Sequence, residues 1–379
     1  MPKTPPTSSQ KLWIETPLIY SRHLSQRLDD EKYRIYLKLE NLQPSQSYKY
    51  RGLSLFVQYQ YAIHGASLHV ICASGGNAGL AAAYAAKRLG VKCTIFFPEG
   101  VAQGTRDFLQ TLGAELVVAG RFFLEALRAA EEAVENDPNA VLIPAYDNPT
   151  LWQGHASMID EMKVQVSRGT RPDAIVCCVG GGGLLGGLIV GCKNAGWDDV
   201  PIIALETHGS NCFYQSILAN REPASIASLP DSITIRHDDE HNVQIAHVHN
   251  LTSKATSLGA TEPSAEVVRM ALDRKGGVRC VSIPDELCMQ VAELFADDHK
   301  MLVELACAAT LAPAYKGSLL QYLVPPVEGR EVAVAFIVCG GFKISLQDMQ
   351  DYAAIVAADK AAGPEWQVLV DGTPLSVPK

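Results

Sequence analysis

The chain has 379 residues, of which 47% are hydrophobic and 19% charged, and its formal net charge is −9. This length allows two lobes, and the composition excludes a disordered or fibrous protein. The negative charge and the absence of any Lys/Arg run argue against a nucleic-acid partner.

Ten cysteines without a C-x-x-C pair lie mostly in apolar runs, which indicates reduced thiols in a cytoplasmic protein. The stretch 174–192 carries no charge, but its many glycines predict a strand, a turn and a helix rather than a membrane span. The N-terminus lacks an apolar signal core, so we expect residues 1–12 to form a loose tail.

The predicted elements begin with a strand over 34–40. A turn at Pro44 leads into a helix whose apolar face starts at Leu53, with Ser45 or Ser47 as the expected N-cap. Strands and helices then alternate, which predicts parallel pairing through right-handed crossovers. The strands are expected at 68–72, 93–97 and 115–118, and the helices at 80–89, 105–112 and 122–135.

A second α/β series follows from residue 147. We expect its helices at 151–168, 264–273, 285–298 and 303–316, with a further helix that follows the glycines at 180–183 and ends at 188. Its strands are expected at 174–179, 201–206 and 331–339. The segment 235–250 is interpreted as a polar insertion, and residues 358–379 as a loose tail. The chain thus divides into a large lobe (1–42 and 147–379) and a small lobe (43–146).

Lys49 lies where the first helix of the small lobe is expected to begin. The positive end of a helix dipole disfavours an ammonium there and favours the neutral, nucleophilic amine. A solvent-facing lysine beside Arg51 is the alternative when this segment is considered alone.

Four consecutive glycines, Gly180–Gly183, join a strand to a helix. Successive glycine N–H groups can converge on a phosphate, and the helix dipole adds to the attraction. The pattern Gly181-x-Gly183-x-x-Gly186, with Glu206 ending the next strand, also fits a dinucleotide fingerprint and a nicotinamide oxidoreductase. That alternative leaves Lys49 without a role.

The turn from Ser74 to Gly79 opens another helix. It offers backbone N–H groups and a hydroxyl for a carboxylate, and the amide of Asn77 for a phenolic oxygen. Taken alone, this composition is equally typical of an ordinary turn.

Four motifs occur together in order: Ser47-x-Lys49-x-Arg51-Gly52, the turn at Asn77, the tetraglycine, and a strand ending Cys339-Gly340-Gly341. In these motifs the chain resembles the fold-type-II pyridoxal-phosphate enzymes, and within them the serine dehydratase branch of the serine/threonine dehydratases, over residues 16–346. The resemblance implies a two-lobe α/β fold like the tryptophan synthase β subunit, with parallel sheets flanked by helices. It also implies a cytoplasmic homodimer, acting in gluconeogenesis, that converts L-serine, and also L-threonine, to a keto acid and ammonia.

The resemblance also implies the site. Lys49 would hold pyridoxal phosphate as an aldimine and, once freed, remove the α-proton. Cys339 would face the pyridine nitrogen as a neutral thiol, which favours β-elimination over transamination. The phosphate would bind at Gly180, Gly181, Gly182, Gly183 and Leu184, the ring hydroxyl at Asn77, and the substrate carboxylate at Ser74, Gly75, Asn77 and Ala78. A β-replacing or racemising relative and a catalytically silent homologue are the alternatives.

Related enzymes bind a monovalent cation such as K⁺ near the phosphate loop, which implies Glu206 and the carbonyl of Ser210 as ligands here; an ordinary capping acid is the alternative for Glu206. The chain departs from the family pattern at Phe342-Lys343, a bulky pair expected close to the cofactor ring, and this pair puts the substrate in doubt.

Several histidines lie in the expected insertion. His247 and His249 could ligate a metal from one strand face, but we interpret them as incidental residues of a solvated acidic loop. His155 is interpreted as a structural helix residue rather than a general base.

Overall fold

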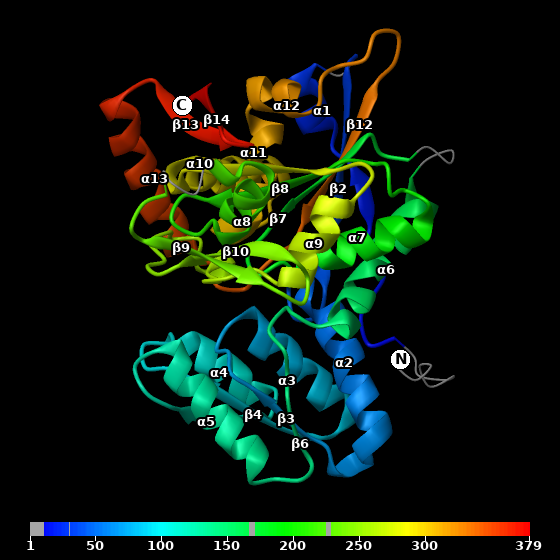
Figure 1. Ribbon diagram of the computed structural model, residues 1–379, viewed down its shortest axis with the longest axis vertical. Helices are drawn as coiled ribbons and strands as arrows, with labels where there is room; N and C mark the ends of the chain where they lie inside the picture. The colour runs from blue at the N-terminus through cyan, green and yellow to red at the C-terminus, as the bar shows by residue number, and fades with distance from the viewer. Residues whose placement is uncertain (1–10, 30, 167–170, 225–228) are drawn as a thin grey trace.

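The structure is a computed structural model that describes residues 11–29, 31–166, 171–224 and 229–379. It consists of two lobes, each built on one main sheet (Figure 1). The sheet of the larger lobe has eight strands in the order β1-β2-β12-β7-β8-β11-β13-β14. These strands are β1 (Leu18–Tyr20), β2 (Tyr33–Leu39), β12 (Val332–Val338), β7 (Ala174–Cys178), β8 (Ile202–Thr207), β11 (Val278–Ile283), β13 (Glu365–Val370) and β14 (Thr373–Pro378).

The centre of this sheet, from β2 to β11, is parallel, as the alternation of strands and helices predicts. Its strands are buried along nearly their whole length, which suits continuous apolar runs such as Val332–Val338. Both edges are antiparallel, with β1 on β2 and the β13–β14 hairpin on β11, so the larger sheet is mixed rather than purely parallel.

The prediction of a loose C-terminal tail over 358–379 is wrong. Residues up to Ala362 complete helix α13 (Leu346–Ala362), and the rest form the β13–β14 hairpin. Alternate side chains of the hairpin, including those of Trp366 and Val368, are buried against the large lobe. Alternation over a strand this short is a weak sequence signal, and the pairing partner lies some ninety residues earlier in the chain. The predicted N-terminal tail falls mainly on residues 1–10, outside the described residues.

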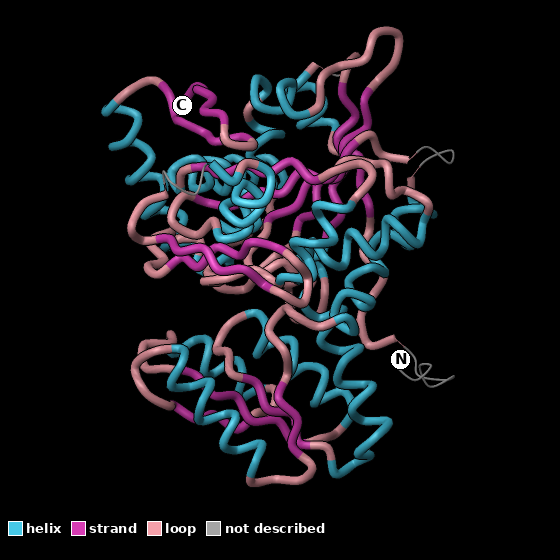
Figure 2. The backbone as a smooth tube through the Cα atoms, viewed as in Figure 1, coloured by secondary structure: helices cyan, strands magenta, loops and turns pink. Residues whose placement is uncertain are grey.

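The four-stranded sheet of the smaller lobe is entirely parallel, in the order β5-β4-β3-β6. Figure 2 shows its strands between layers of helices. The strands are β3 (His69–Cys72), β4 (Lys92–Phe97), β5 (Glu115–Val118) and β6 (Ala140–Leu142), and the helices are α2 (Lys49–His64), α3 (Asn77–Leu89), α4 (Gln103–Thr111) and α5 (Phe123–Glu135). The short strand β6 was not predicted, because three residues carry no readable period.

Helices cover both faces of the large sheet (Figure 1). They are α1 (Arg22–Leu28), α6 (Pro149–Gln165), α7 (Gly183–Ala195), α8 (Cys212–Arg221), α9 (Ala265–Asp273), α10 (Asp285–His299), α11 (Leu305–Tyr315), α12 (Gly317–Leu323) and α13. Helix α6 packs against both α7 and α2, so it joins the lobes. No helix within the described ranges combines the length and the apolar character that a membrane crossing needs.

The expected polar insertion forms an antiparallel hairpin of β9 (Ile233–Asp238) and β10 (Val243–Val248). Its inner strand packs on α8, with Ile245 and Ala246 buried. It is therefore an ordered part of the large lobe rather than a solvated loop.

Candidate functional site

Lys49 is the first residue of helix α2, and the end of strand β12 holds the chain just before it. The N–H of Tyr48 donates to the carbonyl of Cys339 at 3.0 Å, and the N–H of Gly341 donates to the carbonyl of Gln46 at 2.8 Å. Two motifs almost three hundred residues apart are thus joined by backbone hydrogen bonds. The predicted caps Ser45 and Ser47 are wrong, because α2 begins after Tyr48 without a side-chain cap.

The amine of Lys49 lies 3.5 Å from the carbonyl oxygen of Ala145, at the point where the small lobe returns to the large one. Burial lowers the pKa of Lys49, and the positive charge of Lys343 lowers it further. Both effects enlarge the neutral fraction of the amine, which is the form that can attack an aldehyde or accept a proton.

A buried ion network anchors helix α2 two residues further on. The guanidinium of Arg51, fully buried, makes paired hydrogen bonds of 2.6–2.7 Å to the carboxylates of Glu40 and Glu161. Lys38 donates to Glu161 at 2.6 Å. Burial alone would lower the pKa of Arg51, but the two carboxylates raise it, so it stays charged. Arg51 is therefore a positioning residue for Lys49 and not a solvent-facing neighbour.

The tetraglycine joins β7 to α7 and forms a cradle that only glycine fits. A Cβ on Gly181 would come within 2.4 Å of the ring of Tyr146, and one on Gly180 within 3.0 Å of the carbonyl of Leu258. Gly182 has φ +101°, where L side chains are strained. Helix α7 begins at Gly183 without a side-chain cap, so its first N–H groups are available to an anion. These features fit a phosphate group.

Tyr146 was not predicted, although it belongs to the segment that connects the lobes. Its hydroxyl donates to the carbonyl of Glu262 at 3.0 Å, its ring lies against Gly181, and its Cβ and backbone lie against Gly183. An aromatic residue in a turn gives no sequence signal for contact with a glycine loop more than thirty residues later.

The turn before α3 lies at the carboxyl end of β3, facing the large lobe. The amide of Asn77 donates to Glu304 Oε1 at 3.0 Å and to Ser257 Oγ at 3.3 Å, and its oxygen accepts the N–H of Phe342 at 3.1 Å. Ser74 Oγ accepts the N–H of Gly76 at 3.3 Å. Asn77 is thus already paired, and a bond to a phenolic oxygen would replace its longer bond to Ser257.

Glu304 is an acidic residue of this region that was not predicted as a site residue from the sequence. Besides Asn77, its carboxylate accepts the hydroxyl of Ser257 and, at 2.9 Å, the N–H of Lys343. It is 5% exposed. Glu304 therefore links the small-lobe turn to the segment that follows β12.

Cys339 ends β12 among other thiols. Its sulfur lies 3.5 Å from that of Cys178, and Cys307 Sγ accepts the N–H of Gly340 at 3.4 Å. The contacts with these two thiols, together with burial, raise the pKa of Cys339 well above its ordinary range. The residue is therefore a neutral thiol, as the resemblance implies.

Glu206 is the penultimate residue of β8, Ser210 follows the strand, and each already has partners. The carboxylate of Glu206 accepts the N–H groups of Phe213 and Tyr214 at 3.1 and 2.5 Å, so it caps helix α8. Burial raises the pKa of Glu206. Ser210 Oγ donates to the carbonyl of Leu258, next to the glycine cradle.

Each of the histidines singled out in the sequence packs against or bonds to a neighbouring side chain. His155 is buried against Tyr48 with ring centroids 4.9 Å apart, and burial lowers its pKa to about 3, so it stays neutral. In the β9–β10 hairpin and just after it, His247 bonds Glu262 at 3.0 Å and His249 bonds Thr234 at 3.1 Å. No group of three or more metal-ligating side chains is found in the part of the chain that the structure describes.

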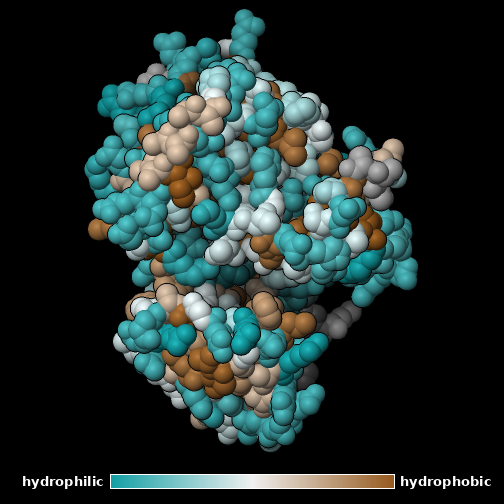
Figure 3. Space-filling view, turned by 90° about the vertical axis from the view of Figure 1, so that its left-hand side faces the viewer, coloured by the Kyte–Doolittle hydropathy of each residue, from teal (hydrophilic) through white to brown (hydrophobic). Residues whose placement is uncertain are grey.

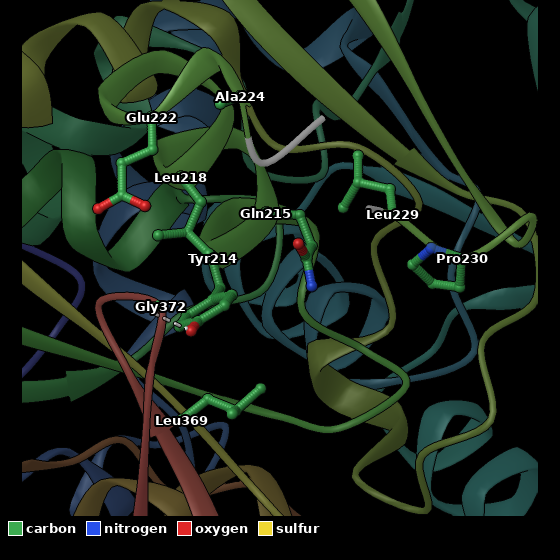
Figure 4. A pocket seen from close by; sticks show the side chains of 9 residues that line it. All are labelled: Tyr214, Gln215, Leu218, Glu222, Ala224, Leu229, Pro230, Leu369 and Gly372. Carbon is green, nitrogen blue, oxygen red and sulfur yellow. Dashed lines mark hydrogen bonds between the residues drawn. The ribbon is translucent and has the colours of Figure 1, made fainter. Parts of the chain in front are cut away.

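A cavity of about 470 Å³ lies elsewhere, between α8 and the β13–β14 hairpin (Figure 4). Tyr214 bonds the N–H of Gly372 at its edge, and none of the residues predicted for the site lines it. The predicted residues instead meet where the strand ends of the two lobes face one another, and Figure 3 shows a groove between those lobes.

Comparisons with known proteins agree with this arrangement. A family model described as "Pyridoxal-phosphate dependent enzyme" matches residues 10–340. The human protein named "Serine dehydratase-like" is 38% identical over 341 residues, which cover 89% of this chain and 93% of the human one. The human "L-serine dehydratase/L-threonine deaminase" is 35% identical over 347 residues, 90% of this chain and 95% of that protein.

Among solved structures, a fungal L-serine ammonia-lyase from Rhizomucor miehei superposes with a TM-score of 0.77 at 32% identity, covering 91% of this chain and 99% of that one. This likeness bears out the two-lobe α/β architecture of the fold-type-II enzymes. The chain therefore belongs to the family of pyridoxal-phosphate dependent enzymes.

Proposed function

We propose that this protein is an L-serine ammonia-lyase that also accepts L-threonine, forming pyruvate or 2-oxobutanoate and ammonia. The observation that carries the proposal is the placement of Lys49 at the start of α2, where the backbone N–H of the preceding Tyr48 donates to the carbonyl of Cys339. The nearly full-length similarity to relatives named for serine dehydration supports the reaction.

Bound pyridoxal phosphate supplies an electron sink for the negative charge that develops at the substrate α-carbon. Lys49 would bind its aldehyde, and Gly180–Gly183 with Leu184 would bind its phosphate. Cys339 would lie at the ring nitrogen, where an un-ionised thiol leaves that nitrogen unprotonated and the sink weak. A weak sink favours prompt loss of the β-substituent.

The remaining residues would hold the substrate. The turn formed by Ser74, Gly75, Asn77 and Ala78 would receive the α-carboxylate with its N–H groups and the serine hydroxyl. Lys49, with its lowered pKa, would take the α-proton at Nζ. The substrate would reach these residues through the groove between the lobes.

The test is direct. Purified protein should be yellow, and borohydride reduction should attach the cofactor to Lys49, as peptide mass mapping would detect. L-Serine should yield pyruvate in a coupled lactate dehydrogenase assay. Lys49→Ala should abolish both the colour and turnover, while Lys193→Ala, at an exposed lysine of α7, should change neither. Turnover that persists in Lys49→Ala would refute the proposal.

The same assay separates the alternatives. Formation of D-serine without pyruvate would indicate a racemase, and exchange of the β-substituent for an added thiol would indicate a β-replacing enzyme. Bound cofactor without any turnover would indicate a silent homologue. The nicotinamide alternative predicts reduction of added NAD⁺ instead of a yellow chromophore.

We also propose that Glu206 and the carbonyl of Ser210 bind a monovalent cation such as K⁺. Two observations support this placement: Glu206 is buried, and Ser210 Oγ donates to the carbonyl of Leu258, which lies next to Gly180. Activity should then fall when K⁺ is replaced by tetramethylammonium, and Glu206→Gln should remove the difference. Equal activity of the wild type in both salts would contradict it.

We propose, finally, that the enzyme is a cytoplasmic homodimer with a place in gluconeogenesis, as the family resemblance implies. Light scattering of the purified protein at several concentrations tests the dimer. Imaging of a tagged chain in its source cell tests the compartment.

A further inference from the structure

The segment Phe342-Lys343 connects the two lobes at the site. The N–H of Phe342 donates to Asn77 in the small lobe, and the N–H of Lys343 donates to Glu304 in the large lobe. The Phe342 ring packs against Phe108 of α4, with ring centroids 6.3 Å apart. These contacts fix the backbone on which the Lys343 side chain is mounted.

The ammonium of Lys343 lies directly over the turn before α3. A Cβ built on Gly76 would stand 3.8 Å from Lys343 Nζ and 3.7 Å from both Lys343 Cε and Ser74 Oγ. An ammonium has three N–H donors, and one of them goes to Thr256 Oγ1 at 3.1 Å. The side chain is exposed, so it can turn a further donor toward a molecule on Gly76.

The positive charge of Lys343 also lowers the pKa of Lys49, so the two side chains lie close enough to interact. The ammonium of Lys343 gains most from an anion that rests on the turn beneath it. The α-carboxylate of an amino acid is such an anion, and the proposed function already places it on this turn. This step therefore rests on the proposed function.

We propose that Lys343 binds the substrate α-carboxylate from the large lobe, opposite the small-lobe turn at Ser74 and Gly76. The carboxylate would then be held between the two lobes, so that binding draws them together over the substrate. Lys343 is in this role a specificity residue that selects amino acids with a free carboxylate over their amides.

The experiment measures ligand binding rather than turnover, so its outcome does not depend on whether serine is eliminated. L-Alanine, which has no leaving group, and L-alaninamide, which lacks the carboxylate charge, are titrated into the holoenzyme by calorimetry. Lys343→Met should weaken L-alanine binding about 10- to 100-fold, the range for loss of a hydrogen bond between charged groups, and leave L-alaninamide binding within about twofold.

Two further variants complete the test. Lys343→Arg keeps the charge and should recover most of the L-alanine affinity, while Lys193→Met, at an exposed lysine, should match the wild type. Unchanged L-alanine binding in Lys343→Met, or an equal loss for the acid and the amide, would overturn the proposal. If the wild type formed no pyruvate from L-serine but the variants showed the predicted binding pattern, the lyase activity alone would be refuted.

Discussion

Replacing Arg51 by methionine tests how helix α2 is anchored. The substitution removes the guanidinium but keeps an unbranched apolar chain in its place. It deletes the two hydrogen bonds of 2.7 Å to Glu40 and leaves that fully buried carboxylate with only Thr16 and Gln43. Glu161 still has Lys38. Removing one partner of a buried ion pair costs about 3–5 kcal/mol, because the remaining charge is uncompensated.

Urea unfolding of the holoenzyme, followed by circular dichroism, would measure this loss from the midpoint at constant m-value. Arg34→Met is the matched control, because its single bond of 3.0 Å to Glu331 joins side chains that are 44% and 43% exposed. Such a pair is worth less than about 1 kcal/mol. The double variant Arg51→Met/Glu40→Gln should recover part of the stability. Equal costs for Arg51→Met and Arg34→Met would refute the reasoning.

Three further predictions follow from the same structure. Gly181→Ala should weaken cofactor binding at least ~10-fold in a fluorescence titration, because its Cβ would meet the Tyr146 ring at 2.4 Å. Gly104→Ala is the control and should not weaken binding, because the space around Gly104 is open. Burial lowers the pKa of His155 from 6.5 to about 3, so as the pH drops the imidazole is protonated in the unfolded chain before it is protonated in the folded one. The unfolding free energy should therefore decrease as the pH is lowered from about 6.5. His155→Gln should make this pH dependence weaker. Ending the chain at Gly363 removes β13 and β14 and exposes the edge of β11. The unfolding midpoint in urea should then drop, and light scattering should rise as molecules associate through the exposed edge. An unchanged unfolding midpoint would contradict the assigned pairing.

Much of the candidate site could be predicted from the sequence, because each of its motifs lies within a few consecutive residues. A glycine run after an apolar strand, a lysine at a helix start and a Ser-Gly-Gly-Asn turn each take their chemistry from neighbouring residues. Parallel strands bring their carboxyl ends to one edge of a sheet, which is where ligands bind in such folds. Several periodic segments were likewise predicted with small errors at their ends, as for β12 and α10, whereas α8, β11 and α13 were not predicted.

The contacts between these parts were decided only by the tertiary structure. Nothing near Lys49 in the sequence indicates that Cys339 orders its backbone, that Tyr146 fills the space over Gly181, or that Glu304 takes the amide of Asn77. The C-terminal hairpin was missed for the same reason, since its pairing and burial come from β11, far away in the chain. Local pattern determines which backbone conformations and reactive groups a segment offers, whereas long-range packing determines which of those groups are paired, buried or left for a ligand.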